Sequence, residues 1–212
     1  MPWTDAQVLA CFKMPTGLTI TGRSSSVRNV FVAAILPVTR PTADEVREVL
    51  DIFGLDPTHL ACSYCGDTAS EWDHLRPLVE GGRPTGFPSS IRNLVPACGK
   101  CNQSKGKSDW RAWMQGQARL CPGKRGILDL QSRVERLERY EKWANCTPID
   151  VESIVSPELL SRYYAIQEEI LGRMRDAQAI AQQISAEIRN VNTLASRAAA
   201  GSSVTTLGSR ET

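Results

Sequence analysis

Residues 62–75 read CSYCGDTASEWDHL and residues 93–102 read NLVPACGKCN, so a Cys-x-x-Cys pair stands near each end of one segment. Each pair bends the backbone so that two sulfurs converge, and two pairs complete the four-thiolate site that binds tetrahedral zinc. The chain has seven cysteines, an odd number that favours a metal over a set of disulfides. The predicted zinc ligands are Cys62, Cys65, Cys98 and Cys101. Because such a closed site has no position for a substrate, we expect this zinc to be structural.

Polar residues lie inside and beside this cysteine frame. Asp73 and His74 follow the first pair. Asn93 precedes the second pair, and Asn102 comes directly after it. A zinc ion that holds the two ends of the segment would bring these side chains together. In a segment this small the metal can supply much of the folding free energy.

The sequence between the cysteine pairs predicts a hairpin. The loop LVEGGRPTGFPSSIRN, residues 78–93, has the glycines and prolines of a connection between strands. We expect those strands around residues 73–75 and 93–95. The residues after the last cysteine, NQSKGKSDWRAWM at 102–114, predict the opening of a short helix.

The full string C-x-x-C … W-D-H-L-x-P-L … G-G … I-R-N-L-V-P-A-C-x-x-C-N-x-x-K-G resembles the HNH endonuclease family in its zinc-stabilised, restriction-enzyme-like form. The match covers residues 60–114 and involves many positions at once. The resemblance implies an α+β fold whose ββα-metal core has two antiparallel strands and one helix around a single catalytic metal. It also implies hydrolysis of phosphodiester bonds in double-stranded DNA.

The resemblance assigns a role to each polar residue. Asp73 matches the metal ligand on the first strand, and His74 matches the general base. Asn93 matches the central asparagine that holds the loop and orients the histidine. Asn102 matches the helix position that supplies the second metal ligand. This position is often histidine in the family; the asparagine variant also occurs there, and it shifts the metal preference.

These residue types suit the cleavage of a phosphodiester. An imidazole with a pKa near ~6.5 can accept a proton from water at neutral pH. A carboxylate and an amide offer only oxygen ligands, which suits Mg²⁺, with Mn²⁺ as a substitute. Structural alternatives exist for each residue: an Asp-His pair often only packs, Asn93 can serve a turn, and Asn102 can cap a helix.

Contacts with DNA must come from a local patch, because the formal net charge of the chain is only +2. We predict that Lys105, Arg76, Arg92 and Lys107 contact phosphates. Lys105 is the best placed of them, one helical turn beyond Asn102. The alternative is that these side chains form an ordinary solvated surface.

We expect the cysteine module to span residues 59–118. The regions on either side of it have patterns of their own. Residues 1–58 predict a mixed α/β region that is irregular through residue 25. SVRNVFVAAILPV at 26–38 is a dense apolar stretch, a buried helix or a buried strand, with helix favoured by its alanines. A Thr-x-x-Glu capping box at 42–45 and a glycine at 54 predict a helix at 43–53.

Residues 119–200 predict a helical region. ILDLQSRVERLERYEKW at 127–143 has apolar residues at helical spacing. Ser156 and Pro157 then begin a long helix whose apolar stripe lacks a stop signal before Gly201. Such a helix can build a homodimer, whereas a monomer can fold the helix back onto residues 127–143. We expect residues 201–212 to form a disordered tail.

Other classes of protein are disfavoured. The longest apolar run, residues 30–38, is too short to cross a bilayer, and the start MPWTDAQVLA does not have a signal-peptide pattern. We therefore expect a cytoplasmic endonuclease that needs Zn²⁺ and Mg²⁺ and that acts in restriction or defence. A phage packaging or homing nuclease is an alternative. A non-catalytic zinc module that binds nucleic acid is another, but it would need only the four cysteines.

Overall fold

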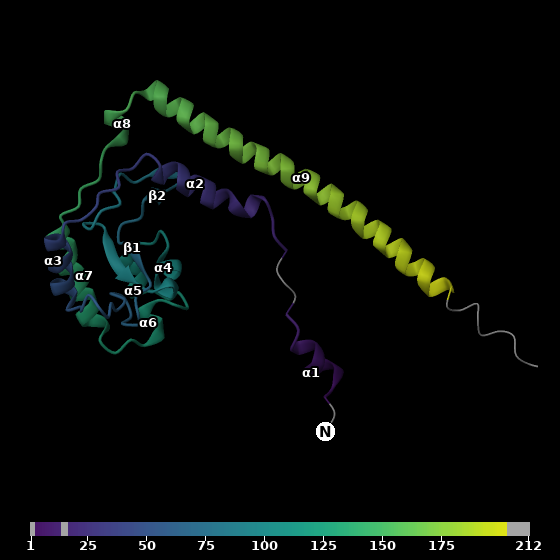
Figure 1. Ribbon diagram of the computed structural model, residues 1–212, viewed down its shortest axis with the longest axis horizontal. Helices are drawn as coiled ribbons and strands as arrows, with labels where there is room; N and C mark the ends of the chain where they lie inside the picture. Colours follow the sequence, from purple (N-terminus) through teal and green to yellow (C-terminus); the bar gives the residue numbers. More distant parts are fainter. Residues whose placement is uncertain (1–2, 14–16, 203–212) are drawn as a thin grey trace, which may run out of the picture. The chain divides into compact units, whose positions relative to one another are not determined.

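The computed structural model describes residues 3–13 and 17–202, with residues 192–202 described as backbone only. The chain divides into two compact units, one formed by residues 28–164 and the other by the residues up to 27 together with those from 165 onward (Figure 1). The elements are α1 (Asp5–Ala10), η1 (Thr21–Arg23), α2 (Ser24–Ala33), α3 (Ala43–Phe53), β1 (Glu71–His74), β2 (Val79–Glu80), β3 (Arg83–Pro84), β4 (Leu94–Ala97), α4 (Gly99–Lys105), α5 (Trp110–Met114), α6 (Pro122–Arg125), α7 (Leu130–Ala144), α8 (Val151–Ile154) and α9 (Pro157–Ser202).

The centre of the larger unit is the antiparallel pair of β1 and β4, which confirms the predicted hairpin. Asp73 lies opposite Val95 in the register, and His74 lies opposite Leu94. The connection between these strands contains a smaller hairpin of β2 and β3. Its two turn residues, Gly81 and Gly82, have φ of 57° and 81°, a conformation that glycine adopts without strain.

The helix expected after the second cysteine pair is present as α4, which completes a ββα arrangement with β1 and β4. It ends at Gly106, where φ is 50°. A separate helix, α5, then begins with Asp109 as its N-cap, whose side chain accepts a hydrogen bond from the Ala112 backbone at 2.9 Å. The glycine therefore divides the predicted helical stretch into two short helices.

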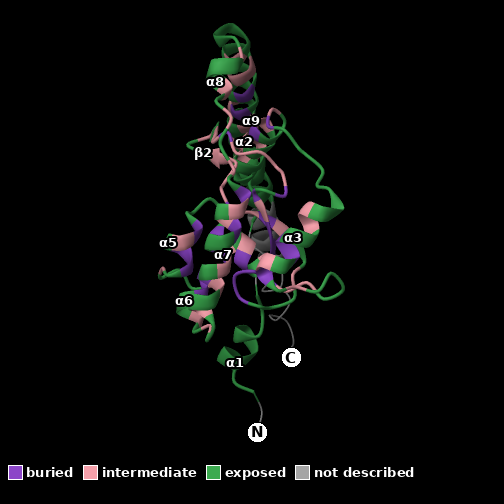
Figure 2. Cartoon of the chain, turned by 90° about the vertical axis from the view of Figure 1, so that its left-hand side faces the viewer, coloured by how far each residue is buried: buried purple, intermediate pink, exposed green. Residues whose placement is uncertain are grey.

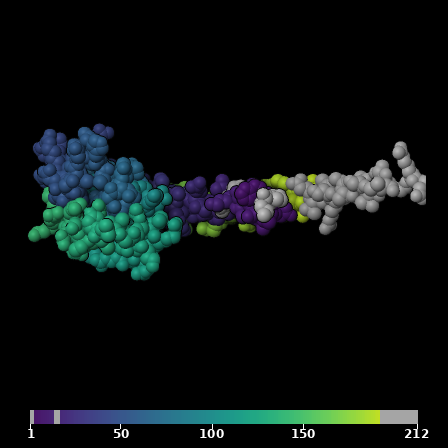
Figure 3. All heavy atoms as spheres, turned by 90° about the horizontal axis from the view of Figure 1, so that it is seen from below, coloured from purple at the N-terminus to yellow at the C-terminus, as the bar shows by residue number. Residues whose placement is uncertain are grey.

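The core of this unit lies between the ββα elements and two covering helices, α3 and α7, which pack together. Figure 2 shows buried residues recurring along α7, and in Figure 3 the unit forms one close-packed body of blue to green atoms. Leu137 and Tyr140 of α7 are fully buried. The Tyr140 hydroxyl lies 2.7 Å from the carbonyl oxygen of Ile91 and 3.0 Å from that of Leu94. This hydroxyl ties α7 to the start of β4.

The helix predicted at 43–53 is confirmed as α3, including its capping box and the left-handed Gly54. The apolar stretch at 26–38 is helical as α2 over most of its length, but only one side of it is buried: Val32 is 0% exposed, whereas Val30 is 65% exposed.

The prediction that residues 1–25 are irregular is wrong for α1 and η1. Thr4 and Gln7 form a capping box at the start of α1, a signal overlooked in the sequence.

The long helix α9 begins with Pro157, and the Ser156 hydroxyl accepts a hydrogen bond from the Leu159 backbone at 3.3 Å. Large apolar side chains on it are exposed: Leu159, Ile166, Ile170, Ile180, Ile184, Ile188 and Val191. Of the predicted tail at 201–212, only the first two residues are described, as the end of α9, and the rest lies outside the described residues. Within the described ranges, none of the helices is both long and apolar enough to span a membrane.

We predict that Leu137→Ala lowers the free energy of unfolding by about 2–5 kcal/mol, because it leaves a cavity between α7 and the hairpin. Leu128→Ala is the matched control, since Leu128 is 103% exposed and its loss should change stability by less than about 0.5 kcal/mol. Chemical denaturation of both variants measures the difference. Equal stabilities would contradict the position of α7 in the core.

Candidate metal centres and active site

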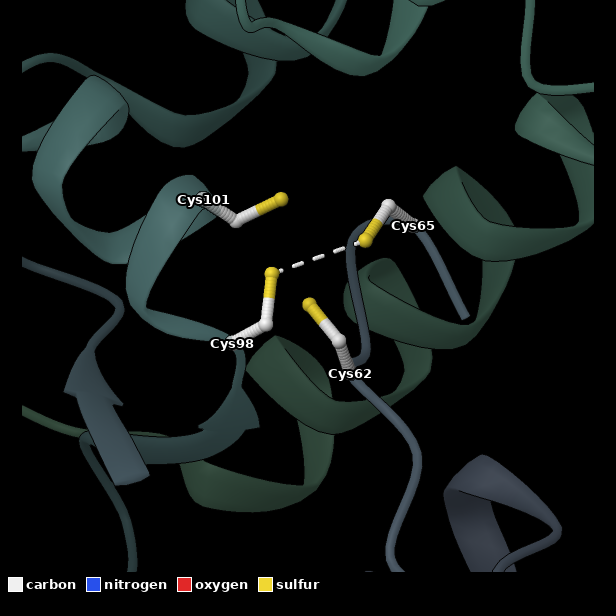
Figure 4. Close-up of side chains that lie close together, drawn as sticks. All are labelled: Cys62, Cys65, Cys98 and Cys101. Carbon is white, nitrogen blue, oxygen red and sulfur yellow. Dashed lines mark hydrogen bonds between the residues drawn. The ribbon is translucent and has the colours of Figure 1, made fainter. Parts of the chain in front are cut away.

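The four cysteines form a cluster that fits zinc. Their Sγ atoms lie within 4.8 Å of one another and all four residues are buried. Figure 4 shows the sulfurs pointing toward a common centre, with 3.7 Å between Sγ of Cys65 and Sγ of Cys98. A tetrahedral zinc with Zn–S bonds of ~2.3 Å places its sulfurs ~3.8 Å apart. The geometry therefore matches a closed structural zinc site.

Local backbone structure builds the first of the two cysteine turns. The Cys62 backbone N–H donates to the carbonyl oxygen of Asp67 at 2.7 Å, and the Gly66 N–H donates to that of Cys62 at 2.9 Å. Gly66 has a φ of 84°, which glycine accommodates at the point where the chain reverses. The Ser63 N–H donates to the Pro96 carbonyl at 2.8 Å, so this turn is fastened directly to β4.

Positive charge lies beside the cysteine cluster. Nη1 of Arg125 is 3.6 Å from Sγ of Cys101, and Nη1 of Arg133 donates to the Cys62 carbonyl at 3.2 Å. Hydrogen bonds from the Cys101 and Cys62 thiols, with a smaller contribution from Arg125, lower the pKa of Cys65. Four thiolates around one Zn²⁺ carry a net negative charge, which the two guanidinium groups partly offset.

Asp73 is held in a buried network. It is only 5% exposed, and its Oδ2 accepts a hydrogen bond from the Tyr64 hydroxyl at 2.7 Å and lies 3.1 Å from Nζ of Lys105. Burial raises the pKa of Asp73, and the interactions with Lys105 and Tyr64 oppose that rise. Among the described residues, none donates a hydrogen bond to Oδ1 of Asp73. This oxygen therefore remains available to a ligand.

His74 follows Asp73 on β1, so the two side chains leave opposite faces of the strand. Nε2 of His74 lies 2.8 Å from Oγ of Ser89, which fixes the orientation of the ring. Burial, and then the charge of Lys105, lowers the pKa of His74. The neutral imidazole, the form that can accept a proton, is thereby favoured at neutral pH.

Asn93 holds the loop that orients His74. It is 1% exposed, and its Oδ1 accepts a hydrogen bond from the Arg76 N–H at 2.8 Å. Its Nδ2 donates to the carbonyl oxygens of Arg76 at 3.1 Å and Pro88 at 3.2 Å. Because Ser89 follows Pro88 directly, these bonds also fix the hydroxyl that contacts His74.

Asn102 contacts a residue that the sequence reasoning missed. Its Nδ2 donates to Oε2 of Glu71 at 2.8 Å. Glu71 lies two positions before Asp73, and strand periodicity places both carboxylates on the same face of β1. That alternation was the available signal in the sequence. With Nδ2 directed at Glu71, the amide oxygen of Asn102 is left for another partner.

The chemistry of these side chains fits a hard divalent cation. Asp73 and Glu71 on β1 offer carboxylate oxygens, and Asn102 on α4 offers an amide oxygen. Mg²⁺ takes such oxygen ligands and keeps several of its waters. The residues present therefore suit Mg²⁺ or Mn²⁺ better than a metal that prefers nitrogen or sulfur ligands.

The basic residues predicted to contact DNA differ in their surroundings. The structure contradicts this role for Lys105, whose side chain is 0% exposed and enclosed by Asp73 and backbone carbonyls. Arg76 is paired with Glu141, and the Arg92 guanidinium lies over the Trp143 ring at 4.6 Å. Both arginine side chains keep about 40% exposure. Lys107 is exposed.

The hairpin, α4, the four-cysteine site and the Asp-His pair together define a zinc-stabilised nuclease domain of the ββα-metal class. Comparison with known families agrees: the model described as HNH endonuclease matches residues 62–108. These residues are an HNH endonuclease domain, and the family hydrolyses phosphodiester bonds.

The chain is also similar to a small part of one curated protein. Over 90 residues, the chain is 30% identical to a CRISPR-associated endonuclease Cas9 from Corynebacterium diphtheriae. The aligned part is 41% of this chain and only 7% of that much longer protein. No solved structure matches the chain. The chain therefore spans only a small part of the length of that protein.

We predict that the purified chain contains one zinc and that Cys101→Ser loses it, because three thiolates no longer close the site. Cys11→Ser is the matched control, because Cys11 is exposed and lies outside the cluster. Elemental analysis and thermal unfolding measure the two effects. Retention of zinc and an unchanged melting temperature in Cys101→Ser would contradict the assignment.

Proposed function

We propose that this protein is a metal-dependent endonuclease that hydrolyses phosphodiester bonds in double-stranded DNA. The observation that carries the proposal is the position of Asp73 and His74 on β1 beside Asn102 on α4, inside an HNH domain. A zinc module that only bound nucleic acid would need the cysteines but would not need these three side chains in this arrangement.

His74 is the general base in this proposal. Ser89 contacts Nε2, so Nδ1 is the nitrogen left to accept the proton of the attacking water. The lowered pKa of His74 keeps the imidazole neutral before the reaction. Asn93 acts through the loop that it holds and has no contact with the reacting atoms. A positioned base of this kind contributes about 10²–10⁴ in rate.

Asp73 and Asn102 would hold the catalytic Mg²⁺, with Mn²⁺ as a substitute. When bound, the ion supplies positive charge that stabilises the phosphate as it reacts. The carboxylate of Asp73 is pre-oriented by Tyr64, and the amide of Asn102 is pre-oriented by Glu71. The zinc at the four cysteines is structural and is separate from this site.

Arg76, Arg92 and Lys107 are the remaining candidates for contacts with the DNA backbone. Lys107 follows α4 and is exposed, so it can reach a phosphate directly. The two arginines are already oriented by protein partners, and their exposed edges can donate further hydrogen bonds. We propose a role in restriction or defence, while a phage packaging or homing nuclease is the alternative.

The long helix supports a proposed homodimer. α9 has 46 residues, about 69 Å at the rise of an α-helix. Its seven exposed large apolar side chains are between 39% and 65% exposed. A second copy of the same helix would remove this stripe from water. A dimer would also place two nuclease domains on one DNA duplex.

We predict cleavage of unmodified plasmid DNA by the zinc-loaded protein with Mg²⁺ or Mn²⁺, and a loss of about 10²–10⁴ in rate for His74→Ala. Because the pKa of His74 is lowered, the wild-type rate should fall with acid only below pH ~6.5, as the imidazole becomes protonated. Single-turnover rates across pH measure both effects.

Several results of this assay would change the proposal. Discrete fragments would favour a restriction enzyme, whereas nicking or a smear would keep the nuclease and remove the restriction role. Equal rates for the wild type and His74→Ala, with zinc retained in both, would exclude His74 as the base. Failure to cut any DNA, modified or unmodified, would favour the zinc module that only binds.

We predict that the protein elutes as a dimer of the 23.3 kDa chain and that Ile184→Glu/Ile188→Glu makes it a monomer. Charges in the apolar stripe would be buried without partners in the dimer. Gln182→Glu/Ala186→Glu adds the same charges on the other side of α9 and should remain dimeric. Light scattering measures the mass. A monomeric wild type would favour the helix folding back onto residues 127–143.

A further inference from the structure

Lys105 is the most unusual charged residue in the larger unit. Its side chain is 0% exposed, although lysine is almost never fully buried unless it is paired. Its ammonium lies 2.9 Å from the carbonyl oxygen of His74, 3.1 Å from that of Gly106 and 3.1 Å from Oδ2 of Asp73. An ammonium has three hydrogens, so these three oxygen atoms satisfy it completely.

The partners of Lys105 connect α4 to β1 at the proposed active site. Asn102 and Lys105 lie three residues apart on one face of α4, and Glu71 and Asp73 lie two apart on one face of β1. Asn102 bonds to Glu71 and Lys105 bonds to Asp73. Two parallel side-chain pairs therefore fix the strand against the helix.

We propose that Lys105 is a positioning residue of the nuclease site, an inference that rests on the proposed function. Its ammonium holds Oδ2 of Asp73 and so leaves Oδ1 as the oxygen that can bind the ion. Its bond to the His74 carbonyl fixes the backbone that carries the base. Lys105 thus sets the placement of Asp73 and His74 relative to Asn102, and it acts without touching DNA.

The surroundings of Lys105 require both the length and the charge of a lysine side chain. Arginine keeps the charge, but its planar guanidinium cannot direct hydrogens at three oxygens grouped around a single ammonium. Glutamine is neutral and shorter, and it would leave Oδ2 of Asp73 with Tyr64 as its remaining partner. Groups that orient metal ligands in this way typically contribute about 10–100-fold to metal affinity or activity.

The test compares Lys105→Gln with Lys107→Gln in the full-length, zinc-loaded protein. Both variants lose one lysine charge, but Lys107 is exposed and lies beyond the end of α4. Mn²⁺ affinity is measured without DNA by electron paramagnetic resonance of the free ion. DNA affinity and the single-turnover rate are measured separately, and zinc content with circular dichroism checks the fold.

For Lys105→Gln we expect Mn²⁺ affinity and the maximal rate to fall by about 10–100-fold, with DNA affinity unchanged. Higher Mn²⁺ should restore part of the rate. For Lys107→Gln we expect the opposite pattern, with weaker DNA binding and unchanged Mn²⁺ affinity. A folded Lys105→Gln with wild-type Mn²⁺ affinity and rate would overturn the proposal, and so would a loss of DNA affinity alone.

If Lys105→Gln does not retain zinc, Lys105→Arg takes its place and the same criteria apply. If neither variant folds, Lys105 is a structural residue and the proposal is overturned. The wild type distinguishes this inference from the proposed function. A wild type that neither binds Mn²⁺ nor cuts DNA overturns the nuclease itself, whereas a wild type that does both, with Lys105 variants unaffected, overturns only the role of Lys105.

Discussion

The convergence of four buried cysteine side chains on one centre, a geometry that fits zinc, is the constraint on which the nuclease domain depends. One pair of cysteines precedes β1 and the other flanks the start of α4, so a metal bound there would close the open end of the hairpin, where Glu71 lies opposite Ala97. Strands of four residues cannot bury enough apolar surface to be stable alone. The free energy of binding a zinc ion at the four cysteines would therefore be part of the free energy of folding this domain.

Polar side chains then position β1 and α4 at the candidate site. Glu71 with Asn102 and Asp73 with Lys105 bridge the strand and the helix. The Asp73–Lys105 pair is buried, and a buried charge without its partner is costly, so each of these two residues needs the other. The same interactions that stabilise the fold also orient the proposed ligands, so stability and activity are coupled at this site.

The covering helices supply the apolar core that the hairpin lacks. α7 packs its buried face against α3 and the strands, and Tyr140 bonds to the backbone at both sides of Asn93. Asn93 in turn holds the loop of Ser89, which contacts His74. A chain of contacts therefore runs from a helix far along the sequence to the proposed general base.

The sequence by itself determined the elements whose signals are local: the cysteine spacing, the capping box of α3, the hairpin and the periodicity of α7. It also indicated the Asp73, His74 and Asn102 constellation. Only the tertiary structure decided that Lys105 is buried and that Glu71 joins the site. The reason is physical: a lysine on a short helix reads as solvated from its neighbours in sequence, and its burial depends on a strand about 30 residues away that packs over it.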